Sequence, residues 1–146
     1  YASLKNSEPE YRVIQPHTVI HNGMRWHVRA WCEKNGEYRD FVQSRIQDKP
    51  DLSPPGDMGK EKDSAWQRIV TLEVTPDPRL SVNQQRVITR DYNMTNGMLK
   101  IKCRAAMASY IVETLRLNGD HHRKPTAQQV VLGNRQAVSE WLWDND

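Results

Sequence analysis

The sequence is poor in the features that mark several large classes of protein. It has only two cysteines in 146 residues, Cys32 and Cys103, too few and too far apart for a disulfide framework or a thiolate metal site. Both lie in apolar-periodic stretches, so we expect buried thiols in a reducing cytosol. No apolar run approaches the roughly 18 residues needed to span a membrane, and there is no signal peptide. We therefore expect a cytoplasmic protein without a membrane partner.

Charge and catalytic motifs are sparse as well. The formal net charge is only +3, so the field of the whole chain is too weak to coat duplex DNA. There is no HExxH motif, no glycine-rich phosphate loop and no Ser-His-Asp arrangement at a recognisable spacing. The chain is nevertheless 37% hydrophobic, which allows a buried core in one domain or two small ones. We expect a binding or regulatory protein, not an enzyme, with no metal or cofactor, whose basic groups act locally.

One segment alternates between two kinds of side chain, as a β-strand does. Residues 24–32 place apolar side chains on one parity: Met24, Trp26, Val28, Ala30 and Cys32. The other parity carries Arg25, His27, Arg29 and Trp31. A half-buried strand with a solvated outer face is the plain interpretation. Two arginines, a histidine and a tryptophan without an acid, however, suit an anion that carries flat rings, such as a nucleotide.

The first part of the chain predicts short strands with tight turns, typical of a small β-barrel or curled sheet over residues 1–48. The expected strands are 1–4, 13–20, 24–32 and 38–46, with turns at Asn22-Gly23 and Asn35-Gly36. Residues 49–64 hold prolines, glycines and many charges, so we expect a solvated linker that includes the charged run 60–63. The chain begins at Tyr1 within an expected strand, and we expect it to be a piece of a longer protein.

Residues 65–146 change to alternating strands and helices and predict a small α+β module. The expected strands are 68–75, 98–102 and 130–132, and the expected helices are 81–91, 104–117 and 135–143. The fold class of the whole chain is therefore α+β, a small barrel followed by an α+β module. Trp141 and Trp143 would pack onto this core or onto a partner subunit. Residues 121–124 predict a solvated loop, in preference to a phosphate contact or a weak metal site.

The pairing of strands 24–32 and 38–46 decides which side chains share the basic face. A three-residue Lys34-Asn35-Gly36 loop with a left-handed Gly36 sets these opposed pairs: Trp31 with Arg39, Arg29 with Phe41, His27 with Gln43, and Arg25 with Arg45. The weak point is that Ala30 then meets Asp40 on the apolar side. A two-residue Asn-Gly loop shifts the register by one and places two arginines among apolar side chains, which costs more. The three-residue loop is therefore favoured.

This register predicts one face of arginines and rings: Arg25, His27, Arg29, Trp31, Arg39, Phe41 and Arg45. Arg25 opposite Arg45 is a like-charge pair, which destabilises a sheet unless an anion or nearby acids neutralise it. Arginine offers planar bidentate donors for phosphate, and the rings offer stacking surfaces for bases. His17 joins this face if the turn at Asn22-Gly23 has three residues, and lies on the core side if it has two.

These same residues resemble the WYL-domain family of transcriptional regulators. Tyr1-Ala2-Ser3-Leu4, Pro16-His17 and the strands at 25–32 and 39–46 follow the family pattern, with Trp26-His27-Val28 at its Trp-Tyr-Leu signature. His and Val at the second and third signature positions resemble the subgroup of phage-defence repressors called BrxR or CapW. The subgroup's C-terminal extension resembles residues 76–94 and the positions Arg104, Ala105 and Tyr110.

The resemblance implies three parts: a winged helix-turn-helix, missing here, that binds operator DNA, a ligand-sensing WYL domain of Sm-like or SH3-like barrel fold, and a dimerisation domain. This chain would then be the sensor and dimerisation region of a bacterial repressor, a homodimer that binds a nucleotide or single-stranded nucleic acid. Motif match assigns His17, Arg25, His27, Arg29, Arg39 and Arg45 to the ligand face, and register adds Trp31 and Phe41. Two other classes stay open: a structural interaction module that meets an acidic partner, and a metal-free ribonuclease that uses His17 and His27.

Overall fold

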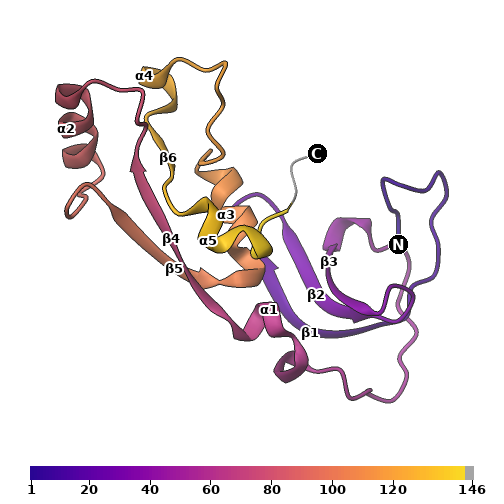
Figure 1. Ribbon diagram of the computed structural model, residues 1–146. Helices are drawn as coiled ribbons and strands as arrows, with labels where there is room; N and C mark the ends of the chain where they lie inside the picture. Colours follow the sequence, from indigo (N-terminus) through magenta and orange to yellow (C-terminus); the bar gives the residue numbers. More distant parts are fainter. Residues whose placement is uncertain (144–146) are drawn as a thin grey trace. The chain divides into compact units, whose positions relative to one another are not determined.

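The computed structural model describes residues 1–143 and divides into two compact units, Tyr1–Gln67 and a second unit that begins at Arg68. Each unit carries one three-stranded antiparallel sheet, with helices mainly in the second (Figure 1). The predicted α+β class is therefore confirmed. Within the described part of the chain, no helix is long and apolar enough to cross a membrane.

The first unit contains β1 (Ile14–His21), β2 (Trp26–Cys32) and β3 (Glu37–Val42), in the order β1-β2-β3, followed by a short turn of 3-10 helix, η1 (Gln43–Arg45). Its small core packs Ala30, Cys32 and Phe41 against Tyr1, Ile14 and Val28. The described residues leave this sheet open, so the closed barrel expected from the sequence is not seen. Residues 1–4 form no strand, although Ala2 N–H donates to the Arg45 carbonyl at 2.9 Å beside the end of β3.

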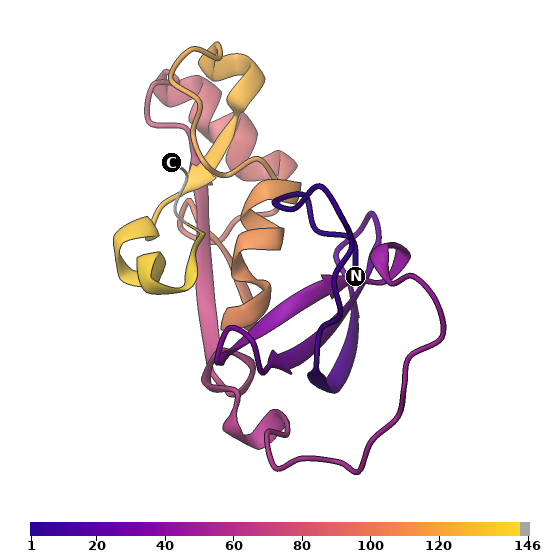
Figure 2. The ribbon, with the colours of Figure 1, turned by 90° about the vertical axis from the view of Figure 1, so that its right-hand side faces the viewer.

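The connection between the units has two different halves. Residues 49–57 are exposed and carry neither helix nor strand, as a solvated linker should (Figure 2). The chain then folds back as η2 (Lys60–Lys62) and α1 (Ser64–Gln67), both within the first unit. Between them Asp63 is only 1% exposed, so the prediction of a solvated charge run is wrong at this residue.

The second unit starts with β4 (Ile69–Pro76), the central strand of a β5-β4-β6 sheet. Ser81 and Gln84 form a capping box that opens α2 (Val82–Asp91), which matches the helix predicted over 81–91. The other elements are β5 (Leu99–Arg104), η3 (Ala105–Met107), α3 (Ala108–Thr114), α4 (Pro125–Gln128), β6 (Val130–Leu132), α5 (Arg135–Val138) and η4 (Ser139–Trp141). The strands follow the predictions, whereas the last two expected helices are shorter and broken into 3-10 and α segments.

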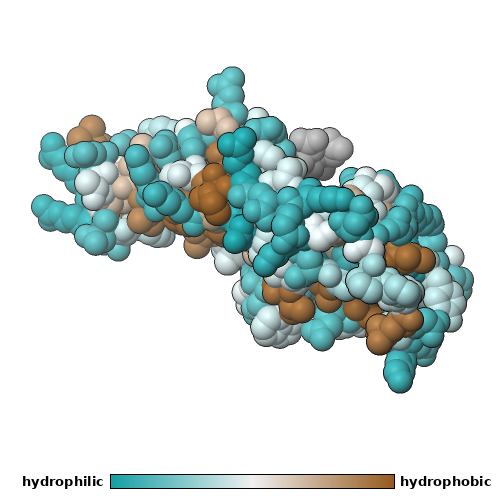
Figure 3. Space-filling model, turned by 90° about the horizontal axis from the view of Figure 1, so that it is seen from below, coloured by the Kyte–Doolittle hydropathy of each residue, from teal (hydrophilic) through white to brown (hydrophobic). Residues whose placement is uncertain are grey.

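Strands and helices of the second unit share one apolar core. Its fully buried members include Leu72, Val74, Ala108, Val112 and Leu117. Trp143 packs its ring edge-on against Tyr110, with centroids 4.7 Å apart, yet remains 47% exposed. Other apolar side chains of this unit also stay exposed, among them Ile69, Val82 and Val87, and Figure 3 shows apolar patches between the polar side chains.

Candidate ligand-binding site

The hairpin between β2 and β3 fixes which side chains share a face. Cys32 pairs with Glu37, so the loop has four residues, and the Asn35 and Gly36 N–H groups both donate to the Cys32 carbonyl. Gly36 takes the left-handed conformation predicted for it, with φ of +64°. The loop is nevertheless one residue longer than the favoured prediction, and the register moves by one position.

The observed register corrects part of the predicted face. Arg29 lies opposite Asp40, Trp31 opposite Tyr38, and His27 opposite Val42. Phe41 and Arg39 lie on the other parity, opposite Val28 and Ala30. Phe41 is buried in the core, and Arg39 is exposed in a salt bridge with Glu37. Phe41 and Arg39 therefore do not share a face with His27, Arg29 and Trp31.

The signature tryptophan also departs from the prediction. The alternation placed Trp26 in the core, but its side chain is 53% exposed and its ring lies edge-on to His21, with centroids 4.8 Å apart. Trp26 is the first residue of β2, beyond the reach of the small core around Ala30. The turn before it spans the four residues 22–25, so Met24 and Arg25 lie outside the strand.

Arg29 forms the centre of a buried ion-pair cluster. Its Nε and Nη2 donate to the two carboxylate oxygens of Asp63 at 2.5 and 3.0 Å, and its Nη1 donates to Asp40 at 3.0 Å. The Arg29 side chain is 8% exposed and that of Asp63 only 2%. Arg29 is therefore a buried, ion-paired cation in this structure, in contrast to the open phosphate donor predicted from the sequence.

His17 joins the same cluster from β1. His17 lies in a β-bulge in the pairing of β1 with β2, between Pro16 and Thr18. Neither of the two placements predicted from the length of the Asn22-Gly23 turn is therefore observed. The His17 Nε2 lies 3.0 Å from Asp63 Oδ2, and its Nδ1 lies 2.8 Å from the Thr18 hydroxyl. The bulge thus brings His17 and Arg29 onto one carboxylate.

Aromatic rings border the cluster. Trp31 meets Tyr38 edge-on with centroids 5.2 Å apart, and Tyr38 in turn meets the His17 ring at 5.6 Å. On the other side, the His17 ring lies 5.8 Å from that of Trp66 in α1. The flat rings predicted for this face are therefore present, but Tyr38 and Trp66 take the place predicted for Phe41.

Charge controls the ionisation of the cluster. Burial alone would raise the pKa of Asp63, but the hydrogen bonds and charge of Arg29, with help from His17 and the Trp66 N–H, outweigh it and lower that pKa. Burial opposes the charge of Arg29 too, yet Asp63 and Asp40 leave its pKa raised. The carboxylate and the guanidinium therefore hold one another in their charged forms.

A second group of basic side chains lies around His27. This ring is only 2% exposed, and burial lowers its pKa, with the charges of Arg25 and Arg45 acting in the same direction and Asp40 against them. The charges of Arg25 and Arg45 thus both act on the His27 ring. Neither guanidinium forms an ion pair or donates a hydrogen bond to another of residues 1–143.

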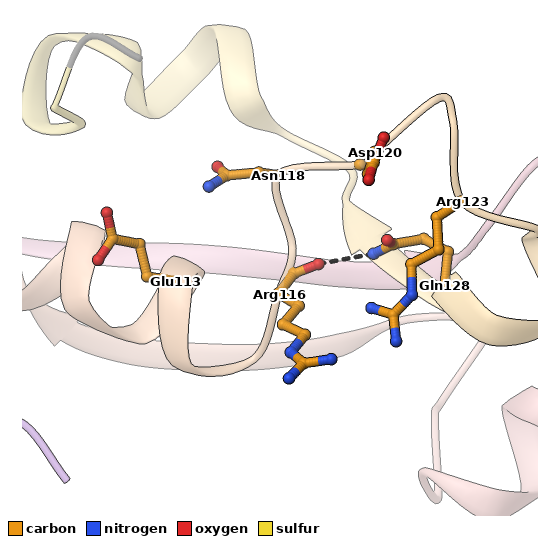
Figure 4. Close-up of a pocket in the computed structure, with 7 residues that line it drawn as sticks. Glu113, Arg116, Asn118, Asp120, Arg123 and Gln128 are labelled. Atoms are coloured by element: carbon orange, nitrogen blue, oxygen red, sulfur yellow. Dashed lines mark hydrogen bonds between the residues drawn. The ribbon is translucent and has the colours of Figure 1, made fainter. Parts of the chain in front are cut away.

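A cavity lies elsewhere, in the second unit. It is a shallow hollow of about 270 Å³, lined in part by Glu113, Arg116, Asp120 and Arg123. Figure 4 shows the Arg116 and Arg123 side chains extending toward the same side, and Gln128 Nε2 donating to the Arg116 carbonyl. The lining of this cavity mixes acidic and basic side chains and includes none of the predicted ligand residues. Across residues 1–143, no group of His, Cys, Asp or Glu side chains is arranged to hold a metal ion.

Comparison with known proteins identifies both units. The WYL domain model matches residues 1–49, and the model of the BrxR transcriptional regulator C-terminal dimerization domain matches residues 69–138. Proteins named DNA-binding transcriptional repressor CapW are similar to the chain: 35% identity over 94% of this chain in Escherichia coli and 36% over 97% in Pseudomonas aeruginosa. The match covers 46% and 48% of those relatives, so the chain spans about half their length.

The two matches follow one another along the chain with the boundary of the compact units between them. Both the first-unit strands and the capping-box helix of the second unit fall inside the matched ranges. The chain therefore carries a WYL domain followed by a BrxR-type C-terminal dimerization domain.

Proposed function

We propose that the chain is the ligand-sensing and dimerisation region of a bacterial WYL-type transcriptional repressor. The observation that carries this proposal is the succession of the WYL and BrxR dimerization domains, supported by relatives that are named transcriptional repressors. Residues 1–48 would sense the ligand, 49–64 connect, and 65–146 dimerise. Operator DNA would be bound through a winged-helix domain outside this chain. By its resemblance to the BrxR and CapW subgroup, the repressor would act in the cytoplasm and control phage-defence genes.

The ligand we propose is a nucleotide or a short single strand of nucleic acid. Arg25 and Arg45 supply two cations beside His27, and neither is neutralised by an acid of the described chain. Trp31 and Tyr38 supply rings on the neighbouring stretch of the same sheet face. Guanidinium groups bind phosphate and rings stack on bases, so this combination fits a phosphate-bearing nucleobase ligand.

A matched pair of double variants tests this site. Arg25→Ala with Arg45→Ala should abolish binding of a short single-stranded DNA, measured by fluorescence anisotropy, while the circular dichroism spectrum and the oligomeric mass stay unchanged. The control is Arg86→Ala with Arg90→Ala, which removes the same charge from α2 in the second unit. If the first double variant binds as the wild type does, the ligand face is assigned wrongly.

The homodimer is proposed for the second unit. Ile69, Val82 and Val87 each leave more than half of their side chains exposed, and such apolar surface is suited to burial against a second copy. Sedimentation equilibrium of the chain should give twice the monomer mass.

We also propose that the open sheet of the first unit is part of an SH3-like barrel. The barrel would extend from the end of β3, where the Ala2 N–H already donates to the Arg45 carbonyl.

A ribonuclease is the weaker candidate. His17 and His27 were the predicted acid and base, but the His17 side chain is 5% exposed and His27 is 2% exposed, so neither ring faces solvent. The relatives are named repressors, and neither matching domain model describes an enzyme. Turnover of a short RNA that is lost in His27→Ala would reverse this ranking.

A further inference from the structure

Asp63 accepts the hydrogen bonds that a phosphate group of the ligand would accept. Asp63 accepts two hydrogen bonds from Arg29 and contacts His17 and the Trp66 N–H, so four groups converge on one carboxylate. Asp63 comes from the connecting segment, 34 residues after Arg29 in the sequence, and not from the sheet itself. A buried carboxylate at the centre of a basic, ring-lined face has the charge and the bidentate geometry of a bound anion.

Other contacts also dock the segment that carries Asp63, among them the edge-on contact between the Trp66 and His17 rings. The Tyr38 hydroxyl donates to the Gly59 carbonyl at 2.8 Å, and the Met58 N–H donates to the Gln15 side chain at 2.9 Å. Gly56 approaches that same Gln15 so closely that a Cβ would lie 2.1 Å from its side-chain oxygen. Before this point residues 49–55 are exposed and irregular, so the segment can leave without unfolding a strand.

We propose that Asp63 is an internal occupant of an anion subsite formed by Arg29 and His17, and that a terminal phosphate monoester of the ligand displaces it. This inference rests on the proposed nucleotide or single-strand ligand and specifies which of its groups enters the cluster. A terminal phosphate carries about −1.5 to −2 charges and three acceptor oxygens at neutral pH. It can therefore replace the three contacts that Asp63 makes with Arg29 and His17, whereas a backbone diester offers a single charge and two free oxygens.

Displacement of Asp63 would also change the connection to the second unit. The Asp63 side chain accepts the Trp66 N–H at 3.1 Å, and its carbonyl accepts the Gln67 N–H at 2.9 Å, so this residue organises the single turn of α1. That helix ends at Gln67, two residues before β4 begins. Loss of the Asp63 contacts would loosen α1. Ligand binding would in this way change the segment that leads directly into the dimerisation domain.

The first test compares variants of two acids in this segment. Asp63→Asn keeps the shape of the side chain but removes the competing charge, so a short DNA strand with a 5′-phosphate should bind roughly tenfold more tightly than to wild type. Asp57→Asn is the matched control, because Asp57 is an exposed partner of Lys62 with the same charge. The same strand with a 5′-hydroxyl should gain little from Asp63→Asn, and a nucleoside monophosphate should gain as much as the phosphorylated strand.

A second measurement needs no substitution. Hydrogen exchange of the wild-type chain should show the Trp66 and Gln67 amides exchanging faster when the 5′-phosphorylated strand is bound. Slower exchange there, or equal binding by Asp63→Asn and wild type, overturns the displacement of Asp63 while leaving a strand that binds at Arg25 and Arg45 intact. If no probe binds to either protein, the proposed ligand site itself fails, and this inference with it.

Discussion

Removal of the Arg29 guanidinium is the most demanding test of the buried cluster. Arg29→Met keeps most of the side-chain volume but leaves the carboxylates of Asp63 and Asp40, 2% and 12% exposed, without their shared cation. Breaking a buried ion pair by removing one partner costs about 3–5 kcal/mol. Small domains are stable by about 5–15 kcal/mol, so the first unit should lose much of its free energy of unfolding.

The matched control is Arg39→Met on the next strand. Arg39 and Glu37 are 47% and 52% exposed, and an exposed pair of this kind contributes about 0–1 kcal/mol. Urea unfolding should be followed by hydrogen exchange of the β2 amides, because these report on the first unit alone. Adding Asp63→Asn to Arg29→Met should recover part of the lost free energy of unfolding, because it removes a buried carboxylate charge that has lost its arginine partner. If Arg29→Met costs no more than Arg39→Met, the cluster does not hold the sheet and connecting segment together.

Three further outcomes follow from other contacts. Burial lowers the folded-state pKa of His27 below 6.5, so the contribution of His27 to stability is complete above pH 6.5 and is lost as the pH falls. His27→Gln should therefore flatten the pH dependence of the urea unfolding midpoint below pH 6.5. Arg79 donates to the carbonyls of His121 and Arg123 from its bidentate pair with Asp77, so Arg79→Met should speed amide exchange in loop 120–123 while leaving β4 protected. Ser81→Ala removes the cap of α2 and should cost about 1 kcal/mol, measured by urea unfolding against Ser139→Ala as a control.

Alternation was enough to predict the strand and the parity of its side chains. His27, Arg29 and Trp31 share one face of β2, because side chains alternate in any extended strand whatever its partners. Alternation could not predict the pairing register, because an Asn35-Gly36 turn can close loops of several lengths. The sequence did contain a signal: Asp40 facing Ala30 was an unfavourable pair, and a shift by one places it opposite Arg29 instead.

The acid that completes the cluster could not be found from the strands. Asp63 lies in a charged run without helix or strand periodicity, and such a run is ordinarily solvated. A buried arginine requires an acidic partner, but the sequence offers 18 acidic residues. Asp63 becomes the partner of Arg29 only because residues 58–67 fold back onto the first unit. Second-unit elements were predicted more completely because capping and periodicity are local, whereas the long expected helices were interrupted by tertiary packing.

The most direct test of the ligand face is the salt dependence of strand binding. Each phosphate contact to a single strand contributes about −0.7 to the slope of log affinity against log salt. Arg25→Ala and Arg45→Ala, made singly so that binding remains measurable, should each reduce the steepness of that slope by about 0.7, and Arg86→Ala should leave it unchanged. Equal slopes for the wild type and the Arg25 and Arg45 variants would contradict the assignment of this face to a phosphate-bearing ligand.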